Sequence, residues 1–233
     1  NQLEAGRADT LKAAELAQQQ GNERAEMVAR GSCAGKLLFD TGELDQARQS
    51  CQRAIDLARG LGARCFDPVN QVIIAKVALI EGRRDEAIAL AEEAVATTRE
   101  TGPRFAGPMA LGTLALVSDS EEVRRQAISE GLAILDSECV SHNYLWFYRD
   151  AMEACLLAGN FDGVEALAQA AADYTSSEPL PWMDLLIARA RTLAQAATAP
   201  DEGTQSRLRE LRDQAAEVGF NVLLPSFDVA MAD

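Results

Sequence analysis

Apolar residues recur along this chain with the spacing of amphipathic helices, and no stretch alternates with the period of two that marks a strand. In residues 87–94 the apolar positions share one helix face and charged side chains occupy the other. Residues 69–80 almost lack a polar face, which predicts a helix packed between neighbours. Asp67 followed by Pro68 predicts the start of that helix, as a capping side chain and then Pro at the first helical position. The chain is therefore expected to be all-α, with apolar first helices covered by amphipathic second helices.

The predicted helix pairs share a turn motif, Gly-x-x-Asp-x-small, which recurs at intervals of 36 to 41 residues. Its clearest positions are Gly42, Asp45 and Ala47, then Gly82, Asp85 and Ala87, then Gly159 and Asp162. Glycine supplies the positive φ that ends the first helix, and the acidic residue lies at the positive dipole end of the second. Weaker copies begin at Gly6, at Ser118 and near Pro200.

Self-similarity at this period is typical of helical repeat arrays. We expect a right-handed superhelical solenoid of five to six antiparallel helix pairs over residues 1–219. The partly apolar tail, residues 220–233, is expected either to cap the last pair or to be disordered.

Composition supports a helical, reduced protein. The chain has 42 alanines, 5% aromatic residues and an odd number of cysteines, five. Buried reduced thiols and a cytoplasmic location follow as expectations. No apolar run is long enough to span a membrane, and the first residues do not resemble a signal peptide. Because the chain does not begin with Met, we expect a fragment of a longer polypeptide.

The formal net charge of −14 is unevenly distributed: residues 1–118 carry −2 and residues 119–233 carry −12. With only 3 lysines and no basic cluster, the chain lacks the footprint expected for nucleic acid or anionic membranes. A soluble partner of the second half is expected to carry basic residues.

Two segments suggest catalysis or cofactor binding but lack the necessary pattern. Residues 31–37 have three residues between the glycines and Leu37 after the lysine, so they fail the P-loop pattern and predict a small-residue stripe for helix packing. His142 is the only histidine, too few for a multi-histidine zinc site, and no serine lies in a nucleophile-elbow context. We expect His142 to begin a helix capped by Ser141, and we expect no catalytic residue, metal or cofactor.

The aromatic residues 144–148 include the strongest binding candidate. His142, Trp146, Arg149 and Glu153 form a stripe on one helix face. Such a stripe either packs between adjacent repeats or lines a concave groove, and Trp and Arg dominate binding hot spots. In a solenoid the next inner helix lies alongside, so Asp184 is expected to pair with Arg149, or Asp150 with Arg189. The candidate interaction groove comprises His142, Asn143, Trp146, Arg149, Asp150, Glu153, Trp182, Asp184 and Arg189.

The repeat motif resembles tetratricopeptide (TPR) repeats of the longer-helix kind found in bacterial signalling proteins. A more specific resemblance covers residues 139–220, which are similar to the C-terminal repeat region of bacterial adenylate/guanylate cyclases that also carry an AAA-type ATPase domain. The motifs are His142-Asn143, Trp146-Phe147-Tyr148-Arg149-Asp150-Ala151, Gly159-Asn160-Phe161-Asp162, Glu178-Pro179-Leu180-Pro181-Trp182-Met183-Asp184 and Ile187-Ala188-Arg189. The resemblance implies a regulatory or scaffolding segment without catalysis of its own.

Two functions are therefore expected to be the main candidates, with an enzyme disfavoured by the lack of convergent titratable groups. The first is a protein-interaction module of a bacterial signalling protein, whose groove takes a protein, a peptide or upstream domains of the same chain. The alternative is a ligand-sensing or oligomerisation repeat domain of a bacterial transcription activator. A homo-oligomer is compatible with either.

Overall fold

The computed structural model describes residues 2–137 and 139–232, and every regular element in these ranges is helical. The α-helices are α1 (Gln2–Gln19), α2 (Glu23–Val28), α3 (Lys36–Thr41), α4 (Leu44–Gly60), α5 (Asp67–Ile80), α6 (Arg84–Thr101), α7 (Pro103–Val117), α8 (Glu121–Leu135), α9 (His142–Leu157), α10 (Phe161–Thr175), α11 (Pro181–Thr198), α12 (Glu202–Val218) and α13 (Leu224–Ala232). A π-helical turn, η1 (Ala29–Gly35), joins α2 to α3 without a break, and 3₁₀ turns η2 (Arg64–Phe66) and η3 (Asn221–Leu223) precede α5 and α13. The all-α prediction is confirmed.

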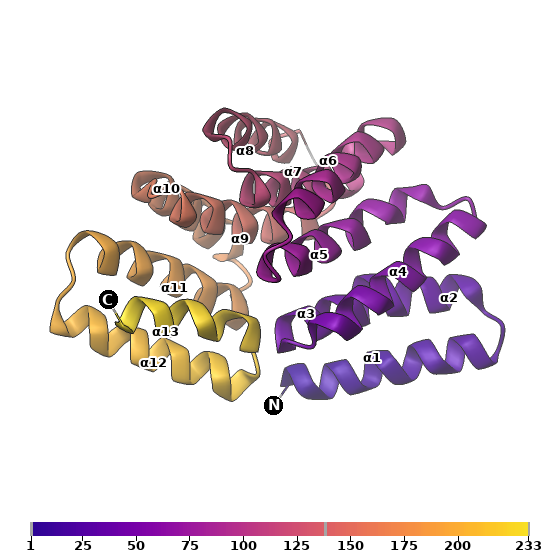
Figure 1. Cartoon of the computed structure of the whole chain (residues 1–233), viewed down its shortest axis with the longest axis horizontal. Coiled ribbons are helices and arrows are strands. Elements are labelled where there is room, and N and C mark those ends of the chain that lie inside the picture. Colours follow the sequence, from indigo (N-terminus) through magenta and orange to yellow (C-terminus); the bar gives the residue numbers. More distant parts are fainter. Residues whose placement is uncertain (1, 138, 233) are drawn as a thin grey trace.

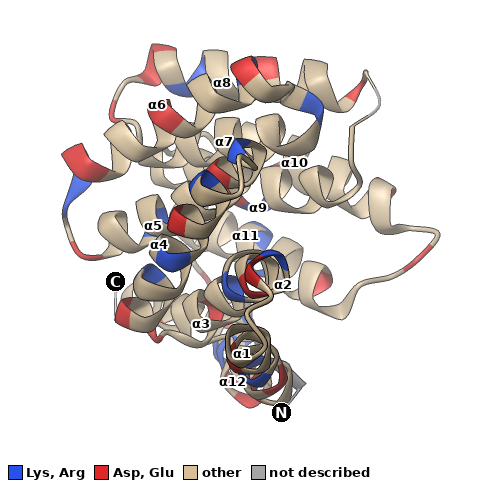
Figure 2. Cartoon of the chain, turned by 90° about the vertical axis from the view of Figure 1, so that its right-hand side faces the viewer, with Lys and Arg blue, Asp and Glu red and all other residues tan. Residues whose placement is uncertain are grey.

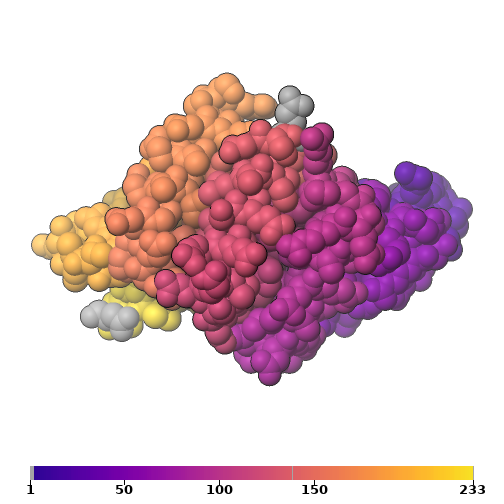
Figure 3. Space-filling model, turned by 90° about the horizontal axis from the view of Figure 1, so that it is seen from above, coloured from indigo at the N-terminus to yellow at the C-terminus, as the bar shows by residue number. Residues whose placement is uncertain are grey.

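Successive helices pack in antiparallel pairs that follow an arc (Figure 1). The inner helices α5, α7, α9 and α11 contact one another in chain order, and each is covered by the amphipathic helix that follows it. The view from above shows the same progression along the sequence (Figure 3). The outer helix α8 carries both acidic and basic side chains (Figure 2).

The turn motif works as its chemistry predicts. Gly42, Gly82 and Gly159 have φ of 89°, 77° and 68°, so each ends its helix in the left-handed region that only glycine adopts without strain. Asp45, Asp85 and Asp162 follow in the first turns of α4, α6 and α10, and Ala47 and Ala87 are fully buried against the preceding helix.

The weaker copies of the motif have different outcomes. Ser120 Oγ and Asp201 Oδ1 accept hydrogen bonds from Val123 N and Thr204 N and cap α8 and α12, so the chain does turn there. Gly6, in contrast, lies inside α1, and the turn predicted there is wrong. The neighbouring residues are good helix formers, and one glycine costs only about 1 kcal/mol in a helix.

The start of α5 also differs from expectation. Asp67 lies in the first turn of α5 rather than at its cap, because η2 runs directly into the helix and leaves Phe66 with helical dihedrals. The Asp67 carboxylate instead accepts a hydrogen bond from Arg59 Nε at 3.3 Å. The body of α5 is buried as predicted, from Asp67 through Ala78.

The small residues of η1 serve packing. A Cβ on Gly31 would collide with Asn70 of α5, and one on Gly35 would collide with Cys51 of α4. This confirms the predicted stripe of small residues. The prediction of buried thiols holds for Cys51 and Cys155, whereas Cys33, Cys65 and Cys139 are only half-buried; all five are free.

The C-terminal segment joins the two ends of the arc. Residues 221–232 form η3 and α13, and Phe220 and Phe227 are buried against α11 and α12, which is the arrangement of a segment that covers the last helix pair. Asn221 Nδ2 also donates a hydrogen bond to the Thr41 carbonyl of α3 at 2.9 Å, across 180 residues of sequence. Val222 packs against both halves of the core. The first helices, α1–α5, and the last helices, α11–α13, are therefore two arms of the arc that close around a shared interior.

Gly131→Ala should destabilise the protein by about 1–3 kcal/mol, because its Cβ would overlap the fully buried Phe147 ring between α8 and α9. Urea unfolding measures this difference. Gly60→Ala is the matched control: no atom lies within 4 Å of its Cβ, and the change should be neutral or stabilising by up to about 1 kcal/mol. Equal stabilities for the two variants would contradict the packing of α8 on α9.

Candidate functional site

Helix α9 carries three buried or half-buried charged side chains that link it to both arms of the arc. Arg149 Nη1 lies 2.8 Å from Asp40 Oδ1 of α3, and both side chains are buried. The two residues are 109 positions apart in sequence but face each other across the interior. The pair therefore exists only because the arc closes.

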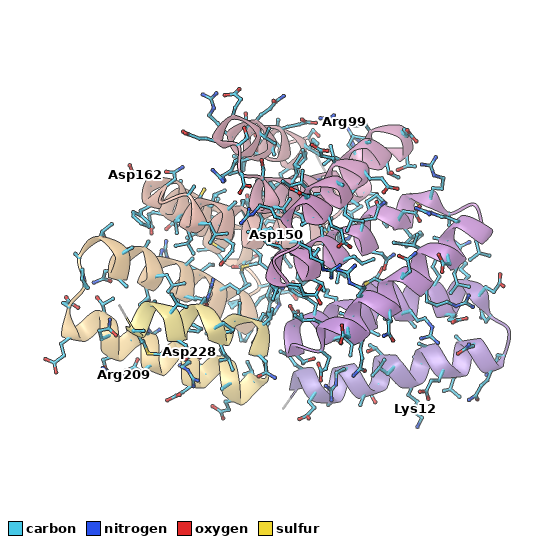
Figure 4. The ribbon with its side chains drawn as sticks, in the orientation of Figure 1. Lys12, Arg99, Asp150, Asp162, Arg209 and Asp228 are labelled. Carbon is cyan, nitrogen blue, oxygen red and sulfur yellow. The ribbon has the colours of Figure 1, made fainter. Side chains whose placement is uncertain are left out.

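Asp150, the next residue of α9, contacts α5 and α7 instead of α3. Its carboxylate accepts hydrogen bonds from Lys76 Nζ of α5 at 3.1 and 3.2 Å, and from Thr113 Oγ1 of α7 at 2.7 Å. Asp150 and Lys76 are 1% and 6% exposed, so this is a buried ion pair with its oxygens satisfied. Figure 4 shows Asp150 at the centre of the molecule, while Lys12, Arg99 and Arg209 lie at the periphery.

Glu153 completes the α9 set. Arg189 of α11 donates two hydrogen bonds to its carboxylate, at 2.6 and 3.1 Å, and a third from Nε to Ser226 of α13 at 3.1 Å. Burial opposes ionisation of Glu153, but the guanidinium groups of Arg189 and Arg149 outweigh it and lower the pKa. The carboxylate is therefore ionised at neutral pH.

A first cavity of about 390 Å³ lies between the two arms. Its walls are mainly apolar, and its charged side chains are the paired residues of α5, α9 and α11. Two exposed apolar side chains also line it: Ile80 of α5 is 51% exposed and Leu157 of α9 is 63% exposed. The lining residues include Phe39, Leu79, Ile80, Leu116, Arg149, Asp150, Glu153, Leu157, Arg189, Val222 and Pro225.

A second cavity of about 300 Å³ lies beneath Trp146. Its lining residues are Ser32, Lys36, Phe39, Val69, Val72, Ile73, Lys76, Phe105, Met109, His142, Trp146 and Arg149. The two cavities adjoin, since Phe39, Lys76 and Arg149 line both. The Arg149 guanidinium lies 5.6 Å from the Phe39 ring centre and 5.7 Å from that of Trp146, within cation–π range.

Basic groups of the second cavity are strongly desolvated. Burial lowers the pKa of Lys36 to about 7; the charge of the nearby Asp40 carboxylate opposes this shift, and the cations Arg149 and Lys76 add to it. Burial likewise lowers the pKa of Lys76 and of His142, although Asp150 and the Phe105 carbonyl act in the opposite direction.

Six of the nine predicted groove residues line these cavities, and three do not. His142 and Trp146 line the second, Asp150, Glu153 and Arg189 line the first, and Arg149 lines both. Asn143, Trp182 and Asp184 line neither.

Asn143 is fully buried between α7 and α9. Its Nδ2 donates to the carbonyls of Arg104, Phe105 and Val140, and its Oδ1 accepts from Met109 N. These bonds anchor the start of α9. Ser141 occupies the N-cap position with helical dihedrals and makes no capping bond, so that predicted cap is wrong, although α9 does begin at His142.

The predicted ion pairs between α9 and α11 are also wrong. Arg149 pairs with Asp40 and Asp150 with Lys76, while Arg189 pairs with Glu153. Asp184 is exposed at the start of α11. The prediction assumed that each inner helix contacts only the next inner helix in the chain. Closure of the arc instead brings side chains of α3 and α5 into contact with α9.

Trp146 packs against a neighbouring helix on one side. Its ring stacks on that of Trp182 of α11 at 5.3 Å between ring centres. Its other surroundings are the second cavity and the ammonium of Lys36, which lies over the ring.

The sequence interpretation missed Lys36, Phe39, Asp40 and Lys76. A signal was present: Lys36 and Lys76 are two of the three lysines in the chain, and Lys76 interrupts an otherwise apolar run. A lone cation on a buried helix requires a partner, which marks it as part of a buried site.

No protein-family model matches this chain, and no curated protein matches it either. Within residues 2–137 and 139–232, no group of three or more His, Cys, Asp or Glu side chains is placed to hold a metal ion. Among the helices of these ranges, none combines the length and hydrophobicity needed to cross a membrane.

Asp150→Asn and Lys76→Met should each cost about 3 kcal/mol or more, because each leaves a buried charge without its partner. The double variant should lose much less than the sum, which a double-mutant cycle by urea unfolding measures. Glu210→Ala, which breaks the exposed pair with Arg207, should cost less than about 1 kcal/mol. Additive losses at positions 76 and 150 would contradict the buried pair.

Glu153→Gln should destabilise the protein by about 2 kcal/mol at pH 7, because it removes charge-assisted hydrogen bonds to Arg189. Because the folded pKa of Glu153 is lowered, its contribution is complete above the unfolded value of about 4.3 and is lost as pH falls through the folded value. The gap between wild type and variant in unfolding free energy should therefore shrink in acid. Glu165→Gln, at the exposed pair with Arg191, should show a gap below about 1 kcal/mol throughout.

Proposed function

We propose that this chain is a non-catalytic interaction module, built as a TPR-like solenoid, that docks a segment of a partner protein into the first cavity. The observation that carries this proposal is the pair of exposed apolar side chains, Ile80 and Leu157, at an apolar cavity between the two arms. Exposed apolar side chains at a concavity are typical of sites that receive an apolar anchor.

The charges indicate what the segment carries. Inside the cavity Lys76, Arg149 and Arg189 are already paired with carboxylates, so the inserted side chain is apolar. Residues 119–233 carry a net charge of −12. Basic residues flanking the anchor would complement this field, raise the association rate and make binding weaken with salt.

The wider setting of the module rests on sequence resemblance. The Gly-x-x-Asp-x-small turns and the motifs of residues 142–189 support a regulatory segment of a cyclase-type bacterial signalling protein. In this proposal the docked segment is a peptide of a partner or of another domain of the same polypeptide.

A second candidate is a ligand-sensing repeat domain of a transcription activator. The observation in its favour is the separate cavity beneath Trp146, which is smaller and is lined by basic and apolar groups. Its dimensions suit a small molecule rather than a peptide.

Selection from a random peptide library should yield binders with a large apolar residue flanked by Lys or Arg. Ile80→Glu combined with Leu157→Glu should weaken the best peptide at least about tenfold in fluorescence anisotropy, because both place a charge at the cavity.

Val218→Glu combined with Val229→Glu is the matched control, since Val218 of α12 and Val229 of α13 are 41% and 64% exposed and neither is among the residues that line the cavity. It adds the same two negative charges and should leave affinity nearly unchanged. Equal loss in both variants would indicate a general effect of the added charges rather than a contact at the cavity, and no loss in either would place binding elsewhere; each result would contradict the proposal.

A further inference from the structure

We propose that the cavity beneath Trp146 binds a small molecule with one carboxylate on a compact apolar body, preferably aromatic. This inference rests on the second candidate function and supplies its ligand class. It is independent of peptide docking in the first cavity.

The first argument is the charge of the lining. Every titratable side chain among the residues that line the cavity is basic: Lys36, Lys76, Arg149 and His142. Lys76 and Arg149 already have carboxylate partners in Asp150 and Asp40, which lie outside the lining. A ligand in this cavity therefore meets cations on several sides and no carboxylate.

The second argument is the state of Lys36. In the described ranges of the chain no carboxylate lies within ion-pair distance of its ammonium, which instead sits over the Trp146 ring. A desolvated ammonium without a counter-ion is costly, and a ligand carboxylate would supply the missing charge. One unpaired cation matches one negative charge, so a monocarboxylate fits better than a phosphate dianion.

The third argument concerns shape and the remaining walls. Apolar side chains from α5, α7 and α9 provide most of the surface, and Phe39, Phe105 and Trp146 provide aromatic faces. A volume of about 300 Å³ suits a molecule on the order of ten non-hydrogen atoms, by comparison with the share of a water molecule in the liquid. The half-buried Ser32 hydroxyl offers a hydrogen-bond donor beside Lys36.

His142 plays a different part from Lys36. Its Nε2 lies 2.8 Å from the Phe105 carbonyl oxygen, which requires Nε2 to carry the proton and donate it to that bond. The Phe105 and His142 rings also meet edge to face, 5.6 Å apart. Histidine therefore shapes the wall, and the lysine supplies the charge that is available to a ligand.

The lysine also predicts how binding depends on pH. Because the pKa of Lys36 in the free protein is about 7, its ammonium is lost as pH rises above that value. A bound carboxylate raises this pKa. The affinity for the carboxylate therefore falls as the pH rises above 7, and in that range each binding event takes up a proton at Lys36. The groups around Lys36 are Cys33 of η1, Asp40 of α3, Lys76 of α5, and Arg149 and His142 of α9.

The test is titration of the full chain with phenylacetate, phenylacetamide and phenethylamine, which share one body and differ in charge. Selective ¹³C labelling of lysine gives three resolvable ε-methylene positions for NMR. Phenylacetate should bind at least about tenfold tighter than the amide and the amine. It should also shift the Lys36 signal and raise the pKa of that side chain.

Lys36→Met should abolish the preference for phenylacetate over phenylacetamide. Lys12→Met, the same change on the exposed face of α1, should leave the preference intact. Lys36→Gln provides a second variant should the methionine alter folding. An equal affinity of wild type for phenylacetate and phenylacetamide would overturn the proposal without any variant.

Other outcomes separate this inference from the two candidate functions. Tighter binding of the amide or the amine would overturn the carboxylate while leaving ligand sensing in place. Absence of binding by all three compounds would overturn the ligand site. Neither result bears on peptide docking, which the Ile80 and Leu157 variants test.

Discussion

The structure depends on α9 keeping its charged side chains between two arms that are distant in sequence. Arg149 must meet Asp40 of α3 and Asp150 must meet Lys76 of α5, while Glu153 must meet Arg189 of α11, in an interior where an unpaired charge is costly. Such pairs add little net stability compared with apolar packing. However, any other rotation of α9 about its axis would leave these charges buried without a partner, at a cost in free energy. Their contribution is therefore to set the register of the inner helices and the distance between the arms.

Local chemistry made much of the fold predictable. The glycines at 42, 82 and 159 need no knowledge of distant residues to end a helix, and the apolar run of residues 69–80 is buried whichever helices surround it. The cavities required more. His142, Trp146 and Arg149 could be singled out by residue type and spacing, but the partner of Arg149 could not, because Asp40 becomes its neighbour only when the arc closes. Asn143 was misplaced for the same reason: its amide serves the backbone of α7, a contact that the pattern on α9 alone does not reveal.

The two cavities share one wall. Phe39, Lys76 and Arg149 face both spaces, so a substitution on this wall alters both at once. Residues that belong to one cavity alone, such as Leu157 on one side and Lys36 on the other, are the positions at which the two spaces can be changed separately. The rings of Phe39, Trp146 and Phe220 also lie within cation–π range of the Arg149 guanidinium, whose carboxylate partner is Asp40.

The hydrogen bond between Asn221 and the Thr41 carbonyl has a consequence for how such a chain can evolve. An open repeat array can gain or lose whole repeats, since each repeat contacts only its neighbours. Here, inserting or deleting one helix pair between α3 and η3 would separate the two residues and leave Arg149 without Asp40. The contact thus constrains the number of helices that the chain can place between α3 and η3, so that adding or removing a helix pair there is no longer a neutral change.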